Sequence, residues 1–163
     1  MNTLIVYYSL EGNTEYAAEK IAASIGADTL RLRPKKAYAD KGLAKYFWGG
    51  KSALMAENPE LMSYEADLSA YDRIVFGFPV WASNFTPPIR TFVKENLEEI
   101  RGKQLAAFAC QSGAGADKAL AKLAIELGID GFETKAVFID PKKKHSDSTD
   151  AAIAEFCRAL QEA

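Results

Sequence analysis

The stretch that decides the fold is LIVYYSLEGNTEYAA, residues 4–18. Its first part, Leu4–Tyr8, is short and apolar throughout, which predicts a strand buried on both faces, as in a parallel sheet. A polar loop with one glycine follows, and apolar residues then recur at the spacing of an amphipathic helix: Ala18, Ile21, Ala22 and Ile25. Gly26 is typical of the end of such a helix.

The same alternation continues along the chain. Further strands are predicted at Thr29–Arg33, Ile74–Phe78, Leu105–Cys110 and Ala136–Ile139, and each of the last three is followed by a helical pattern. The strand at 29–33 alternates in polarity, which suits the edge of a sheet. We therefore expect one domain over residues 1–163, an α/β fold of three layers, α/β/α, whose five-stranded parallel sheet has the order 2-1-3-4-5. The long connection 34–72 is predicted to hold a helix around Gly42–Glu57.

Composition excludes several classes of protein. The 163 residues carry a net charge of −2, so no strong field favours nucleic acid or an acidic membrane. No apolar run approaches the roughly 18 residues of a membrane span, and no targeting signal opens the chain. The single histidine, His145, disfavours a His-based metal site. Cys110 and Cys157 lie in apolar segments and are expected to be buried, reduced thiols in a cytoplasmic, monomeric protein.

The first candidate site is the loop after the first strand. It consists of Ser9, Leu10, Glu11, Gly12, Asn13 and Thr14. Its hydroxyls and its glycine precede a helix whose first N–H groups and positive dipole end favour a phosphate group. The alternative is an ordinary capped turn, because Ser, Asn and Thr also cap helices well.

This loop resembles the phosphate loop of flavodoxins, whose pattern is Thr/Ser-x-Thr-Gly-x-Thr. Glu11 departs from that pattern, since the family usually has a hydroxyl residue there. A carboxylate facing a phosphate would be repulsive, so Glu11 is expected to point outward and to offer only its backbone N–H.

The resemblance implies an FMN cofactor and two more binding loops. The loop after the third strand would hold the flavin ring with Pro79, Val80, Trp81, Ala82, Ser83, Asn84 and Phe85. A Trp at a strand end among small polar residues suits ring stacking, although it could instead cover the following helix. The loop after the fourth strand would contribute Cys110, Gln111, Ser112, Gly113 and Gly115, with no second aromatic.

Two further segments are predicted to lie near this edge of the sheet. Tyr38, Phe47 and Trp48 either pack the extra helix on the sheet, the interpretation we favour, or reach over the flavin. Lys142–Lys144 is interpreted as a solvated run on the cofactor side, where it could attract an anionic partner.

Three functions are compatible with these residues. The first is an FMN-binding electron carrier that serves redox partner proteins. The second is an NAD(P)H-dependent FMN oxidoreductase acting on quinones or similar small acceptors, which the missing aromatic and the long connection favour. The third is an interaction module without cofactor.

Overall fold

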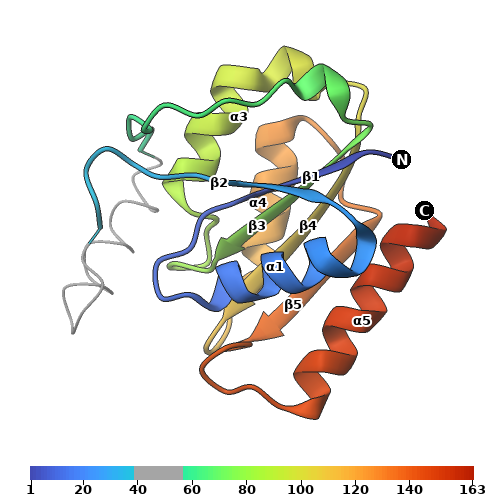
Figure 1. The fold of residues 1–163 in the computed structure, drawn as a ribbon. Helices are drawn as coiled ribbons and strands as arrows, with labels where there is room; N and C mark the ends of the chain where they lie inside the picture. Colours follow the sequence, from blue (N-terminus) through green and yellow to red (C-terminus); the bar gives the residue numbers. More distant parts are fainter. Residues whose placement is uncertain (39–56) are drawn as a thin grey trace.

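The computed structural model describes residues 1–38 and 57–163, so the predicted helix at 42–57, with Phe47 and Trp48, lies almost wholly outside the described residues. Five parallel strands form one sheet in the order β2-β1-β3-β4-β5 (Figure 1). The strands are β1 (Thr3–Tyr7), β2 (Asp28–Arg31), β3 (Arg73–Pro79), β4 (Gln104–Gln111) and β5 (Thr134–Ile139). The predicted sheet and its order are confirmed.

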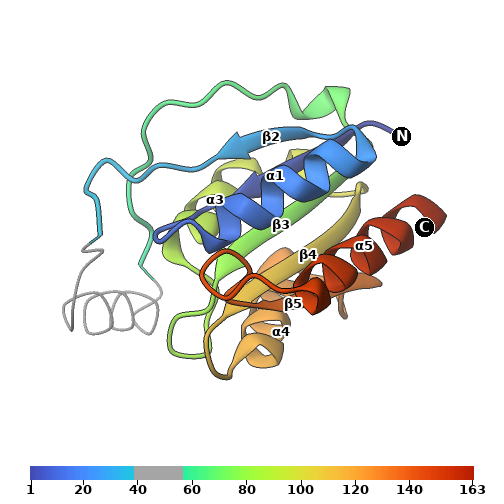
Figure 2. The ribbon, with the colours of Figure 1, turned by 60° about the horizontal axis from the view of Figure 1, so that its bottom comes forward.

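Helices cover both faces of the sheet. They are α1 (Asn13–Ile25), α3 (Pro87–Ile100), α4 (Ala116–Leu127) and α5 (Asp147–Glu162), with a short 3-10 helix, η1, at Leu68–Ala70. In Figure 2, α1 and α5 lie on one side of the sheet, and α3 and α4 lie on the other. Ser146 caps α5, because its Oγ accepts a hydrogen bond from the Thr149 N–H.

The central strands are buried on both faces, as a continuous apolar run predicts. Leu4 and Val6 belong to the core cluster that also holds Phe92 of α3. Ile5 and Tyr7, which alternate with them, belong to the opposite cluster beneath α1 and α5. Each face of the sheet therefore has its own apolar core.

All five strands differ from their predicted bounds by one or two residues, and β1 and β2 end earlier than predicted. β1 ends at Tyr7, so Tyr8 belongs to the loop beyond it. β2 covers Asp28–Arg31, one residue earlier at its start and two at its end than predicted. Leu30 and Leu32 still contact the same core, because the Leu32 N–H donates to the Tyr7 carbonyl at 2.8 Å and continues the pairing.

Both cysteines are unpaired and buried, as expected. In the part of the chain that the structure describes, no helix is long and apolar enough to cross a membrane.

Candidate functional site

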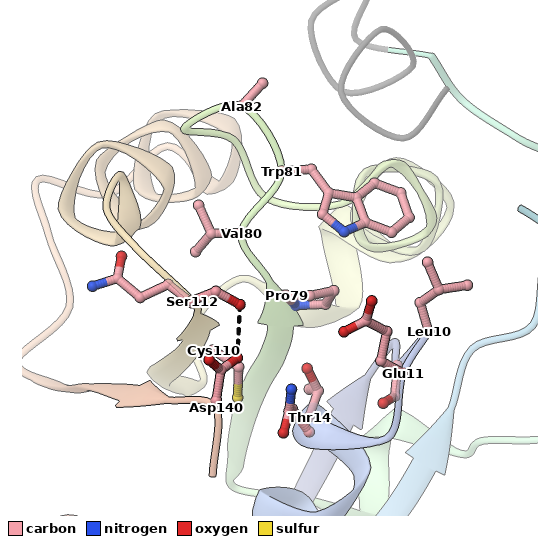
Figure 3. Close-up of a pocket in the computed structure, with 13 residues that line it drawn as sticks. Leu10, Glu11, Thr14, Pro79, Val80, Trp81, Ala82, Cys110, Ser112 and Asp140 are labelled. Carbon is pink, nitrogen blue, oxygen red and sulfur yellow. Dashed lines mark hydrogen bonds between the residues drawn. The ribbon is translucent and has the colours of Figure 1, made fainter. Parts of the chain in front are cut away.

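A pocket of about 330 Å³ opens at the carboxyl ends of β1, β3 and β4. Ligand pockets usually measure roughly 300–1,000 Å³, so this one lies at the lower end of that range. Its lining consists of Ser9, Leu10, Glu11, Asn13, Thr14, Pro79, Val80, Trp81, Ala82, Cys110, Gln111, Ser112 and Asp140 (Figure 3). All three predicted loops meet here.

The first loop leads directly into α1. Gly12 precedes the helix at φ 99°, a left-handed conformation that glycine adopts without strain, and it offers no side-chain cap. The Ser9 hydroxyl accepts the Glu15 N–H at 3.1 Å, so one of the first helical N–H groups is satisfied from within the loop. The Thr14 hydroxyl lines the pocket, is buried, and has no hydrogen-bond partner among the described residues. An unsatisfied buried hydroxyl at a helix N-terminus fits an anionic oxygen.

Glu11 does not point outward, and that expectation is wrong. Its side chain is 21% exposed and turns into the pocket (Figure 3). Its Oε2 accepts a hydrogen bond from Lys143 Nζ at 2.6 Å. A nearby ammonium compensates the carboxylate, which removes the reason to expect it in solvent.

The loop between β5 and α5 brings the lysine run to this site. Asn13 Oδ1 accepts the backbone N–H groups of Lys142 and Lys143, at 2.9 and 3.1 Å. The Lys142 side chain lies across Gly12, with its Nζ 3.1 Å from the position that a Cβ on Gly12 would take. The run is thus exposed, as predicted, but it is also part of the support of the first loop.

The second loop begins with a tight turn. Trp81 and Asn84 exchange backbone hydrogen bonds of 3.1 and 2.9 Å, and the two residues between them, Ala82 and Ser83, both have positive φ, 49° and 59°. Asn84 Nδ2 donates to the Ala82 carbonyl at 2.9 Å and braces the turn. Positive φ at both central positions matches the turns that join two-residue hairpins.

The Trp81 ring belongs to a cluster of three aromatic rings. Tyr8 and Tyr38 meet it edge to face, with ring centroids 5.7 and 5.2 Å from its own. Burial raises the pKa of Tyr8, so its hydroxyl stays protonated. Tyr38 therefore packs against the residues of the pocket wall as well as following β2.

The third loop is tied to the end of β5. The Ser112 hydroxyl donates to Asp140 Oδ1 at 2.7 Å, the bond drawn in Figure 3. Asp140 is 4% exposed and lines the pocket, although it was not among the residues predicted for the site. Its position directly after a predicted strand, at the ligand edge of the sheet, was the signal available. Gln111 Oε1 accepts the Ala116 N–H and so caps α4.

The Cys110 thiol lies at the floor of the pocket, between Thr14 and Asp140 (Figure 3). Burial raises its pKa from the ordinary 9.0 to about 12, the neighbouring Thr14 side chain lowers it, and the Asp140 carboxylate raises it further. The group is a neutral thiol at physiological pH and acts as an apolar filler.

Comparison with known proteins identifies the family of the chain. The family model described as Flavodoxin matches residues 2–144. The chain belongs to the flavodoxin family. No curated protein matches it.

Several solved structures share the flavodoxin fold. A protein from Bacteroides eggerthii DSM 20697 is 19% identical, with 98% of both chains covered and a TM-score of 0.75. A flavoprotein in complex with FMN from Lactobacillus acidophilus NCFM is 22% identical, covers 87% of this chain and 95% of its own, and has a TM-score of 0.72. The two-electron reduced flavodoxin of Megasphaera elsdenii is 17% identical, with 99% of both chains covered and a TM-score of 0.62.

Within this flavodoxin fold, some predicted site residues are not among those that line the pocket. Those residues are Gly12, Ser83, Asn84, Phe85, Gly113 and Gly115. Phe85 is 1% exposed in the core, with the Arg90 guanidinium 4.5 Å from its ring centroid. Gly115 lets the second and third loops approach, since a Cβ there would lie 2.7 Å from Ser83 Oγ. No cluster of metal-ligating side chains occurs in residues 1–38 and 57–163.

Proposed function

We propose that this chain binds FMN in the described pocket and uses it to carry single electrons between redox partners. The observation that carries the proposal is the Thr14 hydroxyl, which is buried, unpartnered among the described residues and placed at the N-terminus of α1. A phosphate oxygen would satisfy it together with the unpaired N–H groups of the first helical turn.

The other walls of the pocket suit the rest of the cofactor. Trp81 offers a flat ring that Tyr8 and Tyr38 hold from the side. Val80 and Pro79 add an apolar surface, and Ser112 lies beside them in the lining (Figure 3). Bound FMN would supply the redox chemistry, while the chain positions it and keeps water from the buried part of the ring. Because the pocket wall is apolar, we expect the protein to disfavour a negative charge on the flavin ring.

The compartment, the oligomeric state and the partners of the chain are also proposals. Two buried, unpaired cysteines suit a reducing compartment, and we propose a cytoplasmic monomer that serves partner proteins or small acceptors.

Absorption spectroscopy of the purified chain tests the proposal. Added FMN is expected to give a bound-flavin spectrum, and stepwise anaerobic reduction is expected to proceed in separate one-electron steps. Thr14→Val should weaken FMN binding about tenfold, the worth of one hydrogen bond to a charged group. Thr86→Val is the matched control, because the Thr86 hydroxyl is equally buried and unpartnered among the described residues but lies away from the pocket. Absence of FMN binding by the wild-type chain would refute the proposal.

A second function, an NAD(P)H-dependent FMN oxidoreductase, is favoured by one observation. The segment at the end of β4 lines the pocket with Cys110, Gln111 and Ser112, none of which is aromatic. With no aromatic covering it, that side leaves room for a nicotinamide ring or a quinone beside the flavin. Rapid two-electron reduction of the bound flavin by NADH or NADPH alone would favour this function over the carrier.

A further inference from the structure

Glu11 raises an electrostatic question that the proposed function alone does not answer. If the first loop holds the phosphate of FMN, a carboxylate that lines the same pocket opposes it. The N-terminus of α1 supplies the equivalent of only about half a positive charge. Alone, the helix end and the Glu11 carboxylate would give the loop a net negative charge of about one half, which disfavours a dianion.

Lys143 reverses the sign of that balance. Its ammonium lies 2.6 Å from Glu11 Oε2, and the Glu11 side chain is largely buried. Adding one positive charge brings the loop to a net positive charge of about one half. The ammonium of Lys142, which lies across Gly12, adds to the same side.

The position of Lys143 is fixed by more than its ion pair. The backbone N–H groups of Lys142 and Lys143 both donate to Asn13 Oδ1, and Asn13 is the first residue of α1. Asn13 is buried and lines the pocket itself. The β5–α5 loop is therefore anchored to the start of the helix at which the phosphate is proposed to bind.

We propose, on the basis of the FMN function above, that Lys143 determines the specificity of this chain for phosphorylated flavin. By neutralising Glu11 it makes the loop accept the phosphate dianion, so it favours FMN over riboflavin, which has the same ring and ribityl chain but no phosphate. Lys143 acts as a positioning residue and an electrostatic residue, and it does not itself line the pocket.

The test compares the dissociation constants of FMN and riboflavin for the full-length apoprotein, by flavin fluorescence. Lys143→Gln should reduce the preference for FMN about tenfold and leave riboflavin binding unchanged. We expect an effect of this size because a partly buried ion pair contributes more free energy than an exposed ion pair. Glu11→Gln should raise the preference by about the same factor. The double variant should return to within about twofold of wild type, and raising the ionic strength should shrink all these shifts.

Lys122→Gln is the control, because it makes the same change in net charge at an exposed position on α4. If Lys143→Gln behaves like Lys122→Gln, the ion pair has no role in specificity and the inference is wrong. It is also wrong if Glu11→Gln lowers the preference for FMN, since Glu11 would then bind the ligand directly. Failure of the wild-type chain to bind either flavin would overturn the proposed function instead, and the inference with it.

Discussion

Replacing Gly115 by Ala should damage the contact on which the shape of the pocket depends. Gly115 has φ 103°, a conformation that L side chains rarely adopt, and strain of that kind costs about 1–3 kcal/mol. The new Cβ would lie 2.7 Å from Ser83 Oγ and 3.0 Å from Ser83 Cα. The hydroxyl can turn away, but the backbone atom cannot, so overpacking adds about 1–3 kcal/mol. Ala also restricts the unfolded chain, which returns roughly 0.4–1 kcal/mol.

The expected loss in the free energy of unfolding is therefore about 3 kcal/mol. Urea unfolding of the apoprotein measures it, with an unchanged dependence on denaturant concentration. Gly113→Ala is the control in the same loop, because a Cβ there has no heavy atom within 4 Å and φ is not in the positive range. That variant should stay within about 0.5 kcal/mol of wild type. If the two variants are equally stable, the close approach of the two loops does not constrain the fold and this reasoning fails.

Three further predictions concern the pocket. Thr14→Val removes a buried hydroxyl without a hydrogen-bond partner among the described residues, so the stability of the apoprotein in urea unfolding should stay unchanged or rise by up to about 1 kcal/mol. A clear loss of stability would show that the hydroxyl is satisfied within the protein. FMN should quench the fluorescence of Trp81 by stacking on its ring. The Trp81→Phe variant should therefore lose most of the quenching and bind FMN about tenfold more weakly. Quenching that survives in this variant would place the flavin elsewhere. Burial raises the pKa of Cys110 to about 12, so the unfolded chain releases the thiol proton near pH 9 while the folded chain keeps it. The free energy of unfolding should therefore fall by up to about 1.4 kcal/mol per pH unit above pH 9, relative to Cys110→Ala. Identical pH profiles for the two proteins would contradict the assignment.

The sheet and its order were predictable because burial on both faces imposes a recognisable pattern. The runs at 74–78 and 105–110 have no polar alternation, and all their members from Ile74 to Phe78 and from Ala106 to Cys110 are buried. Parallel strands of this kind require helical crossovers, and the right-handed rule then restricts the order of strands to very few possibilities. The place of the candidate site followed from that order, not from any single motif.

The second loop could be predicted only in part, because its residues do not indicate the turn that it forms. Ala82 and Ser83 are not the Asn-Gly or Gly residues that usually signal positive φ at two successive positions. All of residues 79–85 were therefore predicted to contact the cofactor. The turn reverses the chain after Trp81, so that Trp81 lines the pocket while Phe85 returns to the core.

The contribution of the β5–α5 loop was beyond sequence reasoning for a different reason. Lys143 and Glu11 are 132 residues apart, and nothing local to either one indicates the other. Their contact depends on where β5 ends and on the anchoring of the following loop by Asn13. A lone carboxylate in the proposed phosphate loop suggested a conflict, but the solution that we assumed, an outward side chain, was one of two. The protein uses the other, a cation brought in from a distant loop.

The distribution of backbone strain bears on whether this edge of the sheet is a binding site or a set of capped turns. Among the described residues, the only ones other than glycine with positive φ are Ala82, Ser83 and Asp140. Each costs about 1–3 kcal/mol and persists only where neighbours over-determine it. Asn84 braces the first two, and Ser112 and the Lys144 N–H hold Asp140. The two-residue turn itself requires positive φ at both central positions, but Asn and Gly meet that requirement at a lower cost than Ala82 and Ser83. Walls that hold their positions before a ligand arrives suit the preformed pocket for a rigid ring that we propose.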